Sequence, residues 1–149
     1  MATTKRTSRR RAPAHRQLRQ QPETLRLRAL APSFTVNDLQ RSIAWYGDVL
    51  AFTVGERWEE NGRFMGVELK AGTVNVMLTQ DDFAKGRDRK KGEGFRLRCH
   101  TVQNIDKLAA QIQARGGVLD QEPRDMPWGD RLFMITDPDG FKLSFVQER

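Results

Sequence analysis

The chain has 149 residues, long enough for one domain with a hydrophobic core, and a formal net charge of +7. Its single cysteine, Cys99, excludes an intrachain disulfide, and no apolar run approaches the roughly 18 residues that a membrane helix needs. We therefore expect a cytoplasmic protein with no membrane contact and no secretion signal.

The positive charge is concentrated at the N-terminus. Residues 1–28 carry nine lysines and arginines and one acid, whereas residues 29–149 carry 17 basic and 18 acidic residues. So few apolar side chains cannot offset the entropy of ordering, so we predict a disordered basic tail at 1–28 before one domain at 29–149. The tail is interpreted as a solvated arm. The alternatives are a contact with nucleic acid or an acidic partner through residues 5–11, and a transit peptide.

The first half of the domain reads as a strand, a helix and three strands. A leading strand is expected at about 31–36, and Asp38 is a good N-cap for a helix over 38–50 with apolar residues at helical spacing. Strand patterns follow at three segments: 52–58, 63–69 and 73–79.

A cationic loop at 81–94 connects this half to the next. It contains three glycines and five basic residues: Lys85, Arg87, Arg89, Lys90 and Lys91. One interpretation is a lid that recognises an acidic group on a ligand, with Arg87 or Arg89 as its partner. The other is a solvated linker.

The second half repeats the first. Thr35-Val36-Asn37-Asp38-Leu39 returns 66 residues later as Thr101-Val102-Gln103-Asn104-Ile105, so a strand at 95–102 and a helix at 104–115 are expected. Three strands follow, with a tight Asp137-Pro138-Asp139-Gly140 turn before the last: 118–122, 131–136 and 141–147. The repeat predicts an α+β fold in which two βαβββ modules form a curved mixed sheet.

Three segments resemble a known superfamily. Residues 37–52 are similar to the first helix of the vicinal oxygen chelate (glyoxalase/bleomycin resistance) superfamily, with Ala51 where a glycine is usual. The 137–140 turn resembles its last hairpin, and Pro127-Trp128-Gly129-Asp130-Arg131 resembles a segment of its bleomycin-resistance-like branch. The resemblance implies the fold over the whole domain but no single activity, because the fold carries many functions.

The resemblance also implies a metal site with one histidine or glutamate on each of four strands. Counting from the helix caps and turn glycines places these ligands at Ala31, Val76, Leu97 and Ser144. Three of these side chains have no donor atom, so we expect no bound metal and no other cofactor. His100 is one residue out of phase with Cys99 and is expected on the other face of its strand.

An apolar floor is expected on the concave face of the sheet. Five residues would form it: Val74, Val76, Leu78, Leu97 and Cys99. Such a floor suits an apolar or aromatic ligand, and Ser144 would add a polar group to it. The alternative is that these side chains are packed core, and Cys99 is interpreted as a small buried residue rather than a nucleophile.

The predicted ligand cleft is bounded by the 81–94 loop and by Trp128, with Arg87, Arg89 or Arg131 pairing with an acidic ligand group. Trp128 would stack on the ligand or contact a second subunit, and Arg131 would contact the substrate or form a structural ion pair. If the hollow is filled, the cleft would lie between subunits of a homodimer. The sequence thus predicts a metal-independent, small-molecule-binding protein. A lyase, isomerase or dioxygenase of the same fold and an interaction module acting through the tail are the alternatives.

Overall fold

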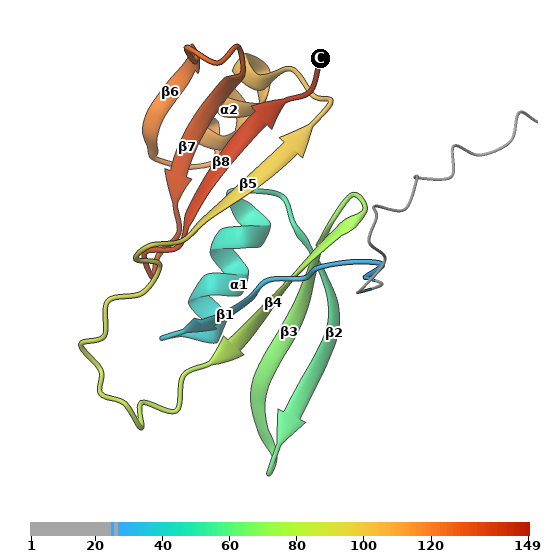
Figure 1. Ribbon diagram of the computed structural model, residues 1–149. Helices are drawn as coiled ribbons and strands as arrows, with labels where there is room; N and C mark the ends of the chain where they lie inside the picture. Colours follow the sequence, from blue (N-terminus) through green and yellow to red (C-terminus); the bar gives the residue numbers. More distant parts are fainter. Residues whose placement is uncertain (1–24, 26) are drawn as a thin grey trace, which may run out of the picture. The chain divides into compact units, whose positions relative to one another are not determined.

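The computed structural model describes residue 25 and residues 27–149, so nearly all of the predicted tail lies outside the described residues. Residues 31–149 form one compact unit. The helices and strands of this unit follow in this order (Figure 1): β1 (Ser33–Val36), α1 (Leu39–Asp48), β2 (Thr53–Glu60), β3 (Arg63–Ala71), β4 (Val74–Gln80), β5 (Arg96–Thr101), α2 (Ile105–Ala114), β6 (Leu119–Asp125), β7 (Arg131–Thr136) and β8 (Lys142–Gln147). None of the helices in the described part is long and apolar enough to cross a membrane.

The predicted α+β fold of two βαβββ modules is confirmed. Each module forms its own four-stranded sheet, in the orders β1-β4-β3-β2 and β5-β8-β7-β6. The outer pairs β1–β4 and β5–β8 are parallel and the other pairs are antiparallel, so both sheets are mixed. The modules do not share one hydrogen-bonded sheet, and the expected single sheet is therefore two sheets.

Both helices begin and end for local reasons. The side chains of Asp38 and Asn104 accept hydrogen bonds from backbone N–H groups in the first turns, at 3.0 Å each. Helix α1 ends in an αL motif, in which Ala51 N–H donates to the Gly47 carbonyl (3.1 Å), and Phe52 N–H donates to the Tyr46 carbonyl (3.0 Å). This motif holds Ala51 in the left-handed region, at φ 61°.

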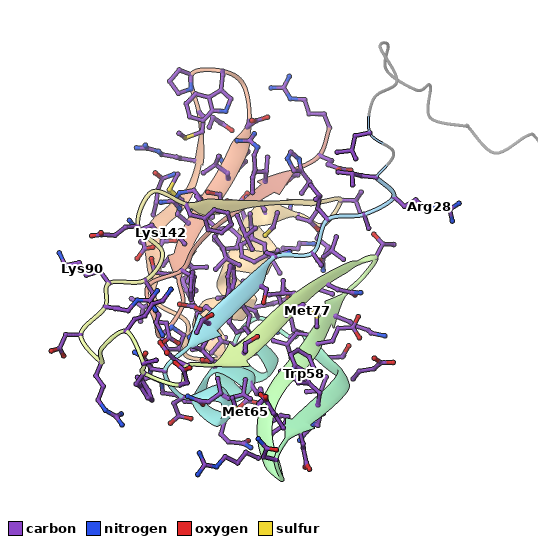
Figure 2. All side chains as sticks on the ribbon, turned by 60° about the horizontal axis from the view of Figure 1, so that its bottom comes forward. Arg28, Trp58, Met65, Met77, Lys90 and Lys142 are labelled. Atoms are coloured by element: carbon purple, nitrogen blue, oxygen red, sulfur yellow. The ribbon has the colours of Figure 1, made fainter. Side chains whose placement is uncertain are left out.

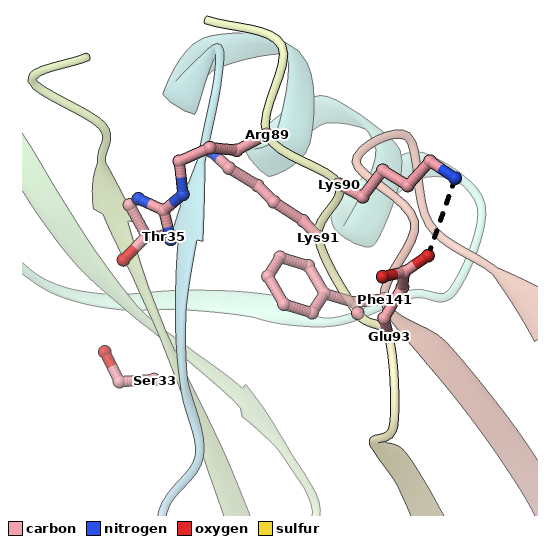
Figure 3. A pocket seen from close by; sticks show the side chains of 8 residues that line it. Ser33, Thr35, Arg89, Lys90, Lys91, Glu93 and Phe141 are labelled. Atoms are coloured by element: carbon pink, nitrogen blue, oxygen red, sulfur yellow. Dashed lines mark ion pairs between the residues drawn. The ribbon is translucent and has the colours of Figure 1, made fainter. Parts of the chain in front are cut away.

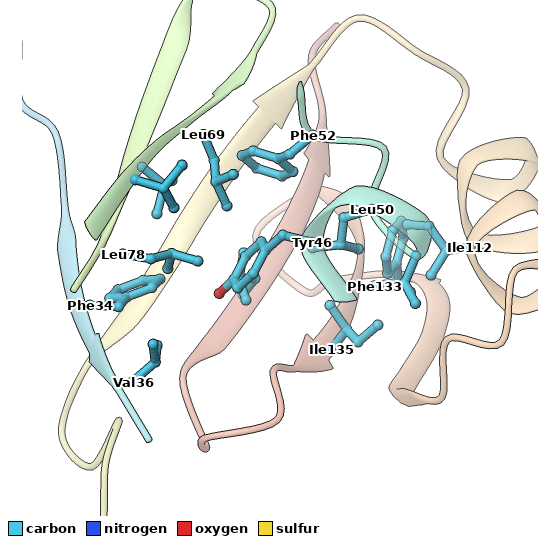
Figure 4. Close-up of a cluster of buried hydrophobic side chains, with 14 of the residues drawn as sticks. Phe34, Val36, Tyr46, Leu50, Phe52, Leu69, Leu78, Ile112, Phe133 and Ile135 are labelled. Carbon is cyan, nitrogen blue, oxygen red and sulfur yellow. The ribbon is translucent and has the colours of Figure 1, made fainter. Parts of the chain in front are cut away.

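The hydrophobic core joins the two modules. Figure 4 shows Leu50, just after the end of α1, beside Ile112 of α2 and Phe133 of β7, in a cluster that also holds Tyr46 of α1 and Ile135 of β7. All of them are buried. Each helix packs against the sheet of its own module, and burial of the apolar surface that the two modules share is the main force that holds them together.

The Asp137-Pro138-Asp139-Gly140 turn adds a polar clamp between the modules. The Asp137 carboxylate accepts a hydrogen bond from the Tyr46 hydroxyl (2.9 Å) and from the backbone N–H groups that follow it in the turn. Asp139 accepts from the Asn37 backbone N–H (2.9 Å) and the Ser42 hydroxyl (3.2 Å). Burial raises the pKa values of both Tyr46 and Asp137. A turn that reads as a simple hairpin in sequence therefore anchors the second module to the start of α1.

Candidate functional site

Each sheet has one face packed on the core and one face turned away from it, which we call the open face. In the second sheet Leu97 and Cys99 pack against the core, so the alternate residues of β5 lie on the open face. In the first sheet Leu78 is buried in the core, and Met77 beside it lies on the open face. The open faces are the surfaces that a ligand can reach.

The five residues predicted to form an apolar floor do not line the open face of either sheet. Val76 and Leu78 are buried in the core, Leu97 and Cys99 pack against it, and Val74 is exposed at the start of β4. Burial also raises the pKa of the Cys99 thiol to about 11, which agrees with a packed residue rather than a nucleophile.

The error has a physical reason in the lengths of the connections. Two residues, 72 and 73, connect β3 to β4, whereas five residues, 137–141, connect β7 to β8. The position four residues after the turn glycine therefore lies on opposite faces in the two modules. It lies in the core at Val76 and on the open face at Ser144. A bend after Thr101 has a similar effect, since it leaves Val102 84 % exposed. Counting back from the cap of α2 to the core-facing residues of β5 is therefore off by one residue.

The residues at the centre of the open faces do not fit the metal that the superfamily resemblance implies. Ser33 pairs with Met77 across β1 and β4, and Arg98 pairs with Ser144 across β5 and β8. Two hydroxyls, a thioether and a guanidinium lack the imidazole and carboxylate donors that hold a divalent ion, and arginine stays charged. Across residue 25 and residues 27–149, no three His, Cys, Asp or Glu side chains converge on one point.

Trp58 is an open-face residue that the sequence analysis missed. It faces Gly66 across β2 and β3, where a Cβ atom would collide with the indole ring, so the ring occupies the space that a side chain at Gly66 would fill. Figure 2 shows Trp58 and Met77 on the first sheet. An irregular register in β2 prevents its face from being read by simple alternation.

A pocket of about 280 Å³ lies where the 81–94 loop passes β1 (Figure 3). Its lining combines cations, hydroxyls and one aromatic ring: Ser33, Thr35, Arg89, Lys90, Lys91, Gly92, Glu93 and Phe141. Lys90 forms an ion pair with Glu93 (3.7 Å). Arg89 makes no ion pair with any residue in the described part of the chain, so its guanidinium is available to a ligand.

The C-terminal end of this loop is fixed to the body of the domain. The Lys91 ammonium donates to Asp81 and to the Asn37 side-chain oxygen, both at 2.7 Å, and the lysine side chain is 5 % exposed. The hydrogen bond from Lys91 lowers the pKa of the Asp81 carboxyl group. Gly92 lies against the Gly140 carbonyl so closely that a Cβ atom would overlap it. Farther along the loop, Arg87 stacks over the ring of Phe83 at 4.1 Å.

Trp128 and Arg131 do not belong to this pocket. Arg131 forms a structural ion pair with Asp106 (2.7 Å) and Asp125 (3.3 Å), one of the two roles expected for it. Trp128 is 61 % exposed and donates from Nε1 to Asp130 at 2.8 Å. It precedes β7 whereas the 137–140 turn follows β7, and six strand residues span roughly 20 Å. Trp128 therefore lies at the opposite end of β7 from the turn beside this pocket, and its role in a ligand cleft stays a prediction.

Comparison with known proteins agrees with this architecture. The family model described as Glyoxalase/Bleomycin resistance protein/Dioxygenase superfamily matches residues 28–145. A lactoylglutathione lyase of Salmonella typhimurium is 26% identical over 130 residues, which cover 83% of this chain and 94% of that protein. The lactoylglutathione lyase GLX1 of Arabidopsis thaliana is 25% identical over 120 residues, covering 76% of this chain and 42% of the plant protein. The chain spans less than half the length of the plant relatives.

Two solved structures illustrate the shared fold. TioX from Micromonospora sp. ML1 has a TM-score of 0.66 at 20% identity, covering 80% of this chain and 98% of that one. A glyoxalase I mutant from Zea mays has a TM-score of 0.68 at 22% identity, covering 80% of this chain and 44% of that one. Together with the family match over most of its length, these findings establish that the chain belongs to the glyoxalase/bleomycin resistance protein/dioxygenase superfamily.

Proposed function

We propose that this chain binds a small molecule with an acidic group and a partly apolar or aromatic body, and that it does so without a metal. The observation that carries the proposal is the pocket beside β1, where the guanidinium of Arg89 forms no ion pair with any described residue. A carboxylate matches the planar fork of donors that arginine presents, and such charge-assisted bonds are the strong ones.

The rest of the lining suits the same ligand. Ser33 and Thr35 supply hydroxyl groups, and Phe141, stacked on Phe34 at 4.2 Å, supplies the edge of an aromatic pair. Pockets for drug-sized ligands measure about 300–1,000 Å³, so a volume of about 280 Å³ favours a molecule of one ring rather than several.

Metal independence follows from the side chains on the open faces. The thioether of Met77 and the guanidinium of Arg98 occupy central positions there, and neither replaces a carboxylate or an imidazole as a metal ligand. The relatives named lactoylglutathione lyase make a lyase the competing function for this chain. Other enzymes of this fold remain alternatives, but the pocket beside β1 favours binding over the lyase.

Two further expectations stay proposals. A homodimer is compatible with the free edges of β1 and β5, each of which pairs with one strand only within residues 27–149. A contact of the basic tail with nucleic acid falls on residues outside the described part, and its affinity should fall steeply with salt.

Titration of the purified full chain with benzoate and with uncharged benzamide tests the proposed function. Benzoate should bind and benzamide should not, because the amide keeps the ring but loses the charge. The Arg89→Ala variant should bind benzoate at least about tenfold more weakly, since a hydrogen bond to a charged group contributes about 1.5–3 kcal/mol. Arg63→Ala removes an exposed arginine outside the pocket and is the matched control.

The proposal is wrong if Arg89→Ala and Arg63→Ala bind benzoate equally, or if benzamide binds as well as benzoate. Lactoylglutathione lyase activity in the protein supplied with zinc or nickel would instead establish the competing function.

A further inference from the structure

Two positive charges face each other across β5 and β8 on the open face of the second sheet. Arg96 is the register partner of Lys142, and both side chains are exposed. Directly opposed like charges destabilise a sheet. Packing of the core does not require two cations at these positions, because the next residues along each strand, Leu97 and Leu143, are the ones that face the core.

Arg98, on the same face of β5, differs from Arg96 because its charge is paired with an acid. Arg98 forms an ion pair with Asp130, which also accepts the hydrogen bond from the Trp128 indole. Neither Arg96 nor Lys142 has an ion pair with any residue in 27–149. Asp120 of β6 lies three strands from Arg96 and two from Lys142, and its carboxylate accepts a hydrogen bond from Thr136 at 2.5 Å. Neither cation of the Arg96–Lys142 pair therefore has an ion-pair partner within the described chain.

A buried hydroxyl lies beside the pair. Ser144 is only 3 % exposed although it belongs to the open face, and its Oγ accepts a hydrogen bond from Arg96 Nη1 at 3.4 Å. Because a hydroxyl both accepts and donates, this contact leaves the Ser144 proton available to a second acceptor. A buried serine that is oriented by an arginine is a ready donor to an anion.

We propose that Arg96, Lys142 and Ser144 form an oxyanion-binding site for the carboxylate or phosphate group of a small molecule. Neighbouring strands lie about 4.8 Å apart, so the guanidinium and the ammonium reach the same anion from two sides. The anion removes the repulsion between the cations and accepts charge-assisted hydrogen bonds from both. The Ser144 hydroxyl supplies a third donor from the sheet itself. This site lies on the second sheet and does not depend on the Arg89 pocket.

The test is an NMR titration of the full chain, once with inorganic phosphate and once with acetate, at constant ionic strength. We expect saturable shifts at the amides of 96–98 and 142–144 with at least one of the two anions. The better binder identifies the phosphate or the carboxylate as the natural group. Lys142→Gln and Arg96→Gln should each weaken binding at least about tenfold, and Ser144→Ala should weaken it less. Lys107→Gln, which removes an exposed lysine of α2, is the control.

A second readout separates the site from a general effect of charge. Without added anion, Lys142→Gln should leave the melting temperature unchanged or raise it, because it relieves the cross-strand repulsion. Equal binding by Lys142→Gln and Lys107→Gln would overturn the proposal, as would non-saturating shifts spread over all basic residues. Arg89→Ala should leave these shifts intact, so a failure here is distinguishable from a failure of the proposed function.

Discussion

Ala51 ends α1 in a backbone conformation that favours glycine, at φ 61°. The left-handed region costs a residue with a Cβ atom about 1–2 kcal/mol, and part of that cost returns because glycine loses more entropy on folding. We therefore expect Ala51→Gly to stabilise the protein by up to about 1 kcal/mol in urea unfolding. Ala44→Gly, in the exposed middle of the same helix, should instead destabilise it by about 1 kcal/mol. Equal effects of the two variants would show that the φ of Ala51 causes no strain.

The ion pair of Lys91 with Asp81 predicts a dependence on pH. The side chains are 5 % and 4 % exposed, and removal of one partner of a buried pair costs about 3–5 kcal/mol, so Asp81→Asn should be strongly destabilising at neutral pH. Lys91 lowers the pKa of Asp81, so the folded state favours the ionised carboxylate. The stabilisation is then present above the unfolded-state pKa of about 4 and is lost as the pH falls through the lower folded-state pKa.

Urea unfolding of the wild type and Asp81→Asn between neutral pH and pH 2 measures this dependence. The difference in their free energies of unfolding should be constant at neutral pH and shrink under acid conditions. A difference that stays constant to the lowest pH would mean that the ion pair does not stabilise the fold. The double variant Asp81→Asn with Lys91→Met should lose less than the single variant, because it leaves no unpaired charge.

At the scale of elements, the 81–94 loop is attached to the 137–140 turn through a glycine. Gly92 has φ +77°, and a Cβ atom there would overlap the Gly140 carbonyl, whereas Gly94 has φ +69° with no heavy atom within 4 Å of that position. Alanine at either position would have to adopt a similar unfavourable φ. The difference between the free energies of unfolding of the two variants therefore measures the contact of Gly92 with Gly140. Gly92→Ala should lower the free energy of unfolding by at least about 1 kcal/mol more than Gly94→Ala. Equal losses would mean that the loop is not fixed by this contact.

The helices and strands were largely predictable from the sequence, but the faces of the strands were not. Asp38 and Asn104 indicate where the helices begin, and the repeat indicates how many strands follow each. Alternation then gives two faces without saying which one packs on the helices. That choice depends on the length of each turn and on the bend after Thr101, so Val76 and Leu97 were assigned to the wrong face.

The candidate site was predictable only where residues are close in sequence. Arg89 belongs to a loop whose charge is visible in the sequence, and the structure places it in the pocket. The roles of Arg96 and Lys142 depend on the register of β5 and β8, strands that lie far apart in sequence, and the role of Trp58 depends on an irregular pairing of β2 with β3. Trp128, chosen for its turn, lies at the other end of β7 from the loop.

For the whole molecule, our proposal is that fixed positive side chains replace a metal as the anchor for an anionic ligand in this superfamily member. The most direct test is to measure benzoate affinity in protein treated with EDTA and dialysed, and again after addition of zinc or nickel, with the metal content determined in both samples. We expect substoichiometric metal after dialysis and the same benzoate affinity in both samples, because the proposed donors are Arg89 and its neighbours. Stoichiometric metal that survives dialysis, or benzoate binding only in the metal-supplemented protein, would contradict it.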